Sequence, residues 1–172
     1  VGSEMCIRDR YWHLGYANNV PSFGGQAAYK ATDRLTWKEA VLIGSHQPHT
    51  SPGFWRYLFD SIVEWKCNPV TVAFEHQASW ERLDLPGNPY AVWMSAQLPA
   101  HWAIDKHWGV TVRPEVAWDR NGRWTGFPQT VKAVTSTVEY RVSYRQATAI
   151  LRVEHRWDDS RGSGGGFFRG WQ

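Results

Sequence analysis

The sequence predicts an all-β fold, an antiparallel up-and-down meander of about nine long strands. Three observations carry this prediction. Apolar and polar residues alternate with a period of two from Tyr11 onward, no segment shows the 3.6-residue period of a helix, and the links between alternating segments are in turn short and long. A sheet built from such strands has one apolar and one polar face, because successive side chains point to opposite sides.

The strands differ in how clearly they alternate. In the last one, the odd positions from Ala147 to Trp157 are apolar except His155, and the even positions are polar except Ile150. The pattern weakens earlier, where Glu39 falls on the apolar side and Trp93 on the polar side. The expected strands cover residues 11–17, 22–31, 35–45, 54–66, 70–81, 90–102, 106–119, 131–143 and 147–158.

One proline interrupts an otherwise regular strand. Pro114 lies in the middle of residues 106–119. A proline has no N–H to donate to the strand ladder, so we expect a β-bulge at this position.

The links favour one particular kind of meander. Alternate links of a meander lie at the same end of the sheet, so all short links share one end and all long links the other. Outer-membrane barrels show this asymmetry, with tight periplasmic turns and longer extracellular loops. The short links are Thr32–Arg34, Cys67–Pro69, Ala103–Asp105 and Tyr144–Gln146, and the long ones are His46–Gly53, Arg82–Pro89, Arg120–Thr130 and Asp159–Phe168.

Composition excludes several classes of protein. The chain has 172 residues, of which 42% are apolar and 20% charged, and its mean hydropathy is −0.51. No stretch approaches the roughly 18–20 apolar residues of a membrane-spanning helix. The net charge of +3 comes from basic residues interspersed with acids, so we expect no nucleic-acid partner. Cys6 and Cys67 are too few for a disulfide framework.

The spacing of the aromatic residues fits a membrane. Trp55 and Trp65 share a face ten positions apart, as do Trp108 and Trp118. Ten residues span roughly 33 Å along a strand, and a tilt of about 40° reduces this to about 25 Å, the height of the apolar band of membrane barrels. We therefore expect contact with a lipid bilayer and an aromatic girdle at its two interfaces. The girdle comprises Trp55, Trp65, Trp80, Trp102, Trp108, Trp118, Tyr140, Tyr144 and Trp157.

The opposite face carries charges of both signs. Such groups cannot be buried dry without partners, so this face is expected to line a wet lumen. In the last hairpin, a four-residue turn over Tyr144–Ala147 places Glu139 opposite Arg152 as a cross-strand ion pair. The expected pore-lining residues are Arg56, Asp60, Glu64, Lys66, Glu75, Glu81, Arg113, Glu115, Asp119, Glu139, Arg141, Arg152, Glu154, Arg156 and Asp158.

Two other classes of protein share this alternation. One is a soluble ligand-binding barrel or sandwich whose aromatic face is the core. Strands of soluble domains average five or six residues, whereas these run to ten or more, which favours the membrane. The other is an outer-membrane barrel with a plugged lumen and a structural or enzymatic role.

No motif indicates an enzyme or a metal centre. His46 and His49 lie in a long link without a third ligand nearby, and His76 and His155 fall on otherwise apolar faces. The glycines of 162–166 follow a strand and lead to no helix, unlike a phosphate loop. We expect no catalytic residue, no metal and no cofactor, and the chain is not predicted to be an enzyme.

The C-terminal third resembles a known family. The segments VRPEVAWDRNGRWTG (112–126), AVTSTVEYRV (133–142) and ILRVEHRWDDS (150–160), followed by Phe167 and Phe168, are similar to the C-terminal part of the OmpL-like β-barrel porins. The positions of this sequence that match the motifs of that family are Arg113, Glu115, Asp119, Glu139, Tyr140, Arg152, Glu154, Arg156, Asp158 and Phe168. It implies an outer-membrane porin of a Gram-negative bacterium, and no catalytic residue carries over.

The resemblance also implies an incomplete barrel. Members of the family are longer, begin with a signal peptide and end on a strand with a terminal aromatic residue, and single-chain bacterial barrels have an even number of strands. We expect residues 11–172 to be part of a transmembrane β-barrel with two open edges, and residues 1–10 to be a linker or assembly artefact outside the fold. The expected function is passive diffusion of ions or small polar solutes, with the oligomeric state left open.

Overall fold

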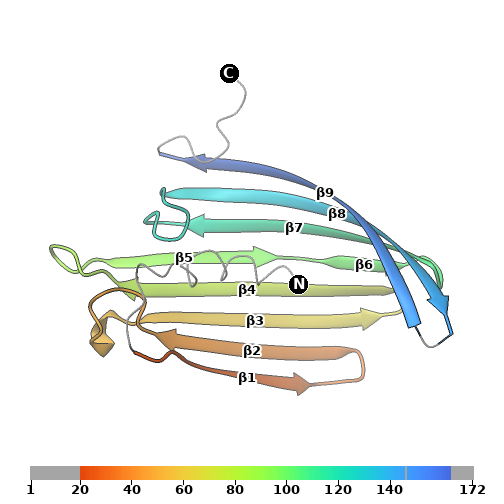
Figure 1. Ribbon diagram of the computed structural model, residues 1–172, viewed down its shortest axis with the longest axis horizontal. Coiled ribbons are helices and arrows are strands. Elements are labelled where there is room, and N and C mark those ends of the chain that lie inside the picture. Colours follow the sequence, from red (N-terminus) through yellow and green to blue (C-terminus); the bar gives the residue numbers. More distant parts are fainter. Residues whose placement is uncertain (1–19, 146, 164–172) are drawn as a thin grey trace.

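The protein forms one antiparallel β-sheet, seen face-on in Figure 1. The computed structural model describes residues 20–145 and 147–163. Consecutive strands are neighbours throughout, and β5 and β6 follow one another between β4 and β7, which confirms the all-β meander. The strands are β1 (Phe23–Lys30), β2 (Leu35–Gly44), β3 (Arg56–Cys67), β4 (Val70–Arg82), β5 (Tyr90–Gln97), β6 (Ala100–Ala103), β7 (Trp108–Asp119), β8 (Gln129–Tyr144) and β9 (Ala147–Gly162).

The nine observed strands are not quite the nine expected ones. The expected strand 11–17 and the proposed artefact 1–10 lie outside the described residues. The expected strand 90–102 is divided into β5 and β6. A single 3₁₀ turn, Pro52–Phe54, lies in the β2–β3 link, and no α-helix occurs in the described ranges.

The bulge expected at Pro114 is wrong. Gln97 pairs with Glu115 and Ala100 with Val112, so the register is the same on both sides of the break and no residue is inserted. The carbonyls of Pro114 and Pro99 accept bonds from Leu98 and Ala73, at 3.1 and 2.9 Å. The missing proline N–H groups therefore interrupt the ladder at Leu98–Pro99 without shifting the register.

The links between the described strands are sorted by length between the two ends of the sheet, as predicted. The fourth expected long link, Asp159–Phe168, is not observed as such, because residues 159–162 belong to β9 and residues 164–168 lie outside the described part of the structure. In Figure 1 the four short links lie at the right-hand end and the links after β2, β4 and β7 at the left-hand end. The strands are long, with 12 residues in β3, 13 in β4 and 16 each in β8 and β9. A tilted strand needs about 9–11 residues to cross a bilayer, so these lengths suffice.

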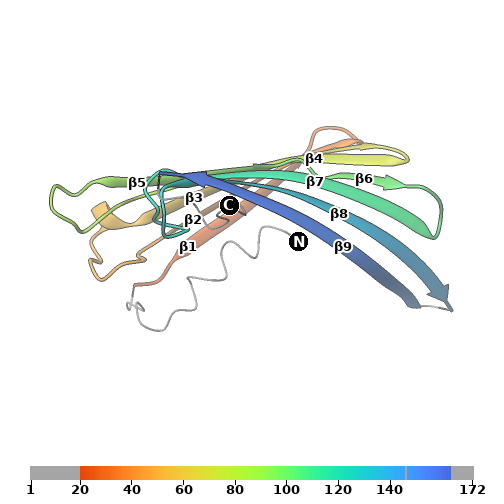
Figure 2. The ribbon, with the colours of Figure 1, turned by 90° about the horizontal axis from the view of Figure 1, so that it is seen from above.

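The sheet is a single curved layer (Figure 2). No second sheet or helix packs against its apolar face within the described ranges, where Val153 is 76% and Trp157 57% exposed. The aromatic-cored sandwich required this face to be covered. In residues 20–145 and 147–163, no helix is long and apolar enough to cross a membrane.

Pairing between strands places side chains on faces as the alternation predicted. Residues opposite one another in an antiparallel pair point to the same side of the sheet. The pair Glu139 and Arg152 is confirmed, with Arg152 Nε 2.9 Å from Glu139 Oε2. Glu39 does lie on the apolar face and Trp93 on the polar face, so both exceptions in the sequence pattern are real features of the sheet.

The short β6–β7 link is held by one carboxylate. Asp105 Oδ1 accepts the backbone N–H groups of Trp108 and His107, at 2.7 and 2.6 Å. These bonds, the one from Trp108 first, hold the pKa of the Asp105 carboxyl below its ordinary value of 3.8. Hydrogen bonds to the charged form have this effect.

We expect the contribution of Asp105 to stability to depend on pH. Because its pKa is lower in the folded state, the contribution is complete above pH 3.8 and is lost as the pH falls through the folded pKa. Asp105→Ala should therefore lower the urea midpoint of unfolding from lipid vesicles at neutral pH, and the difference should shrink in acid. Asp33→Ala, in another short link, is the control, since Asp33 makes only an exposed ion pair with Lys30. An equal, pH-independent loss in both variants would contradict the role of Asp105.

Candidate functional site

The candidate site is the polar face of the sheet. Strand pairing places all of the expected pore-lining residues on this one face. By strand, these are Arg56, Asp60, Glu64 and Lys66 in β3, Glu75 and Glu81 in β4, Arg113, Glu115 and Asp119 in β7, Glu139 and Arg141 in β8, and Arg152, Glu154, Arg156 and Asp158 in β9.

A buried ion triad lies at the long-link end of the face. Arg56 donates two hydrogen bonds to the carboxylate of Glu81, from Nε and Nη2, each 3.0 Å long. Arg123, from the β7–β8 link, contacts Glu81 Oε1 as well. The Arg56 guanidinium also lies 4.8 Å from the centre of the Trp93 ring. Glu81 is 0% exposed, and paired, bidentate charges are what permit this burial.

The β7–β8 link is tied to the same end by Asp119. Its carboxylate accepts the backbone N–H groups of Arg123, Trp124 and Thr125 at 2.6 to 3.0 Å, and the Thr125 hydroxyl at 3.0 Å. Gly122 has a φ of +66°, and a Cβ there would lie 2.8 Å from the backbone of Phe127, so the turn requires glycine. Asp119 thereby positions Arg123 beside Glu81.

A second network crosses from β7 to β9. Arg113 contacts Glu115, and Glu115 Oε2 lies 2.9 Å from Nη1 of Arg156. Arg156 Nε in turn binds Asp158 at 2.9 Å. The alternating signs neutralise one another along this chain of four residues.

A third network lies toward the short-link end. Glu139 contacts Arg141 on its own strand and binds Arg152 on β9. Glu154 accepts a hydrogen bond from the Thr137 hydroxyl at 3.0 Å. A separate ion pair lies in β3, where the Lys66 ammonium is 3.1 Å from the carboxylate of Glu64.

The wall between β3 and β5 is acidic and amide-rich. Glu75 accepts hydrogen bonds from the side-chain amides of Gln97 and Gln77, at 2.5 and 3.2 Å. Asp60 pairs in register with Gln77. No group of three or more histidine, cysteine or acidic residues with metal-binding geometry occurs in the described ranges.

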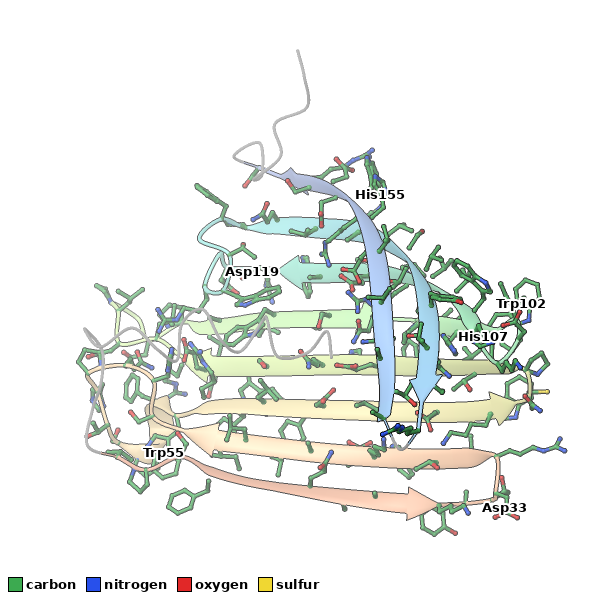
Figure 3. All side chains as sticks on the ribbon, turned by 45° about the vertical axis from the view of Figure 1, so that its right-hand side comes forward. Asp33, Trp55, Trp102, His107, Asp119 and His155 are labelled. Carbon is green, nitrogen blue, oxygen red and sulfur yellow. The ribbon has the colours of Figure 1, made fainter. Side chains whose placement is uncertain are left out.

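The expected girdle residues are divided between the two ends of the apolar face. Figure 3 shows Trp55 at the long-link end and Trp102 at the opposite end, close to His107, with Asp33 farther along that same end. By strand position, Trp80, Trp118 and Trp157 lie with Trp55, and Trp65, Trp108 and Tyr140 lie with Trp102. Trp55 itself precedes β3, and its indole N–H binds the carbonyl of Thr50. The side chain of Tyr144 is outside the described part of the structure.

The sequence analysis did not identify three residues that contribute to the polar face or to the aromatic girdle. Arg123 belongs to a link, where strand alternation carries no information. Trp93 was noticed only as an exception, although its ring partners Arg56. Trp37 lies on the apolar face at the short-link end and is 48% exposed, and its spacing from Leu35 and Val41 could have identified it.

Exposure is inverted relative to a soluble sheet. Among the largest fully buried side chains are Glu81, Asp119 and Thr135, all on the polar face. The exposed large side chains of the strands include Trp65, Trp102 and Trp108 on the opposite face. Long strands, a networked charged face and an exposed aromatic face define the class of β-barrel membrane proteins.

The comparison with known families agrees with this class. The family model described as "Putative beta-barrel porin-2, OmpL-like" matches residues 7–171, and the chain belongs to this family. No curated relative and no solved structure is significantly similar to the chain. The family relation extends the expected resemblance, which covered residues 112–168, over nearly the whole sequence.

Proposed function

We propose that this chain forms part of the wall of a water-filled pore in the bacterial outer membrane, through which ions or small polar solutes diffuse passively. The observation that carries the proposal is the inverted exposure of the two faces. Val153 is 76% exposed on the apolar face, whereas Glu81 is 0% exposed on the polar face. Both exposures are favourable if acyl chains cover the apolar face and water lines the polar face.

The charge pattern of the polar face supports a pore of mixed character. The expected pore-lining residues comprise nine carboxylates and six cationic side chains, and most of the cations lie in ion pairs, so both signs occur along the wall. Rings and clusters of charged side chains set ion preference in pores. A weakly selective passage for ions of either sign and for small polar solutes follows from such a wall.

Conductance measures this function directly. The full chain, reconstituted in planar bilayers, should give stepwise, ohmic channels. Lys38→Glu, on the polar face in the middle of β2, should shift the reversal potential in a salt gradient toward cation preference. Lys132→Glu makes the same change on the apolar face and should shift it much less. Bilayers that contain the protein but show no channels would overturn the proposal.

A further inference from the structure

The apolar face carries a row of three polar side chains across the neighbouring strands β2, β3 and β4. Glu39 of β2 pairs with Ser61 of β3, and Ser61 pairs with His76 of β4. Each of the three lies near the middle of its strand, far from both sets of links. The row therefore crosses the centre of the face that the proposed function places against acyl chains.

Apolar residues frame this row on both sides. Paired rows of the same three strands flank it, and their Phe59, Val63 and Phe74 side chains are 42%, 37% and 48% exposed. The polar row and its two flanking rows are together called the β2–β4 patch. It consists of Glu39, Ser61 and His76, flanked by Trp37, Val63 and Phe74 on one side and by Val41, Phe59 and Ala78 on the other.

The polar row is only partly satisfied by its own sheet. The Ser61 hydroxyl and the Trp37 indole N–H both donate to Glu39 Oε1, each at 2.6 Å. Within residues 20–145 and 147–163, neither Oε2 of Glu39 nor either ring nitrogen of His76 has a hydrogen-bond partner. A carboxylate oxygen and an imidazole thus face outward together.

Acyl chains cannot serve these groups. They offer no donor or acceptor, and headgroups lie at the strand ends rather than at mid-strand. Ionisable side chains inside a membrane are costly and are almost always paired with one another or with polar groups. Glu39 and His76 therefore need a partner molecule that presents an acidic and a basic group at the same depth in the membrane.

We propose that the β2–β4 patch is the contact between two copies of this chain, and this inference rests on the proposed membrane location. The patch is self-complementary, with an acid at one end of the row, a base at the other and a hydroxyl between them. In a two-fold contact the same surface meets itself, so residue i faces j and j faces i. An axis near Ser61 brings Glu39 of each copy to His76 of the other, with the flanking aromatic and aliphatic rows packed around the two ion pairs.

Cross-linking tests the position of the contact. In a background with Cys6→Ser and Cys67→Ser, Ser61→Cys should form a disulfide-linked dimer in proteoliposomes under mild oxidation. Ser136→Cys is the matched control, because Ser136 is also a mid-strand serine on the apolar face but lies on β8, away from the patch. Efficient dimers from both variants, or from neither, would overturn the assignment of the contact to this patch.

A charge exchange tests the pairing itself. Glu39→His and His76→Glu each place like groups opposite one another and should weaken dimerisation in micelles by about tenfold. The double variant Glu39→His/His76→Glu recreates the pair in reverse and should recover dimerisation close to that of the parent. If the double variant is as weak as the single variants, or if the single variants dimerise normally, the Glu39–His76 pairing is wrong.

Nitroxide labels separate this inference from the proposed function. A label at Ser136→Cys should be accessible to oxygen dissolved in lipid and not to a water-soluble nickel complex, whereas one at Ser61→Cys should be protected from both. If both labels are open to lipid oxygen, the dimer contact fails and the membrane location stands. If both are open to the nickel complex, the apolar face meets water, and the proposed function and the contact fail together.

Discussion

Val112→Arg should destabilise the folded protein by about 2–4 kcal/mol in lipid vesicles, because it places a guanidinium among acyl chains near the bilayer midplane. Val112 lies on the apolar face of β7 between Trp108 and Trp118 and is 43% exposed. In a soluble sheet, a substitution at so exposed a site usually changes stability by less than about 0.5 kcal/mol. The size of the effect thus reports what the face contacts.

Val110→Arg is the matched variant for this experiment. It makes the same change on the same strand and face, two residues closer to Trp108. The cost of a charge falls toward the interface, so Val110→Arg should destabilise less. Reversible urea unfolding from vesicles measures both values. Equal and negligible losses would show that water, not lipid, covers the face.

Glu81→Gln should have the largest effect of any change on the polar face, a loss of about 3–5 kcal/mol of unfolding free energy. Removing this carboxylate leaves the guanidinium of Arg56 buried without its bidentate acceptor. It also removes the contact of Arg123, so the β7–β8 link should exchange its amide hydrogens faster. Urea unfolding and hydrogen exchange measure the two consequences.

Glu154→Gln is the control for this change. Glu154 lies on the same face but is exposed, and it accepts a hydrogen bond from the Thr137 hydroxyl, which the amide oxygen of a glutamine can also accept. Its loss should be below about 1 kcal/mol. A similar loss in both variants would mean that the polar face is equally wet throughout, and that the Arg56–Glu81–Arg123 triad holds no special place in it.

The local pattern was sufficient for much of the architecture. Alternation from Ala147 to Trp157 assigned every residue of that stretch to its observed face, because the pleat of a strand is a property of its own backbone. The short turn after Tyr144 also determined the register of the last hairpin, and with it the pair Glu139–Arg152. The exceptions Glu39 and Trp93, which weakened the pattern, each have a partner within the sheet: Glu39 accepts a hydrogen bond from Ser61, and the ring of Trp93 lies against the guanidinium of Arg56.

The prediction of a β-bulge at Pro114 failed because the outcome depended on the residues of the neighbouring strand. Pro114 indicated a bulge, but Pro99 interrupts the ladder on the adjacent side, and together they end pairing locally without inserting a residue. Whether a missing proline N–H shifts the register or only interrupts the ladder depends on the residues of the strand opposite. A sequence pattern within one strand does not contain that information.

The sequence by itself determined the strand period, the two faces, the sorting of links by length and the face on which the charged residues of β3, β4, β7, β8 and β9 lie. Each of these is set within one strand or one tight turn. Only the tertiary structure decided which charges meet, as when Arg123 reaches Glu81 from a link 42 positions away in the chain. Such contacts depend on the registers of all the strand pairs between the two residues. They also depend on the path of the β7–β8 link, which the carboxylate of Asp119 holds in place.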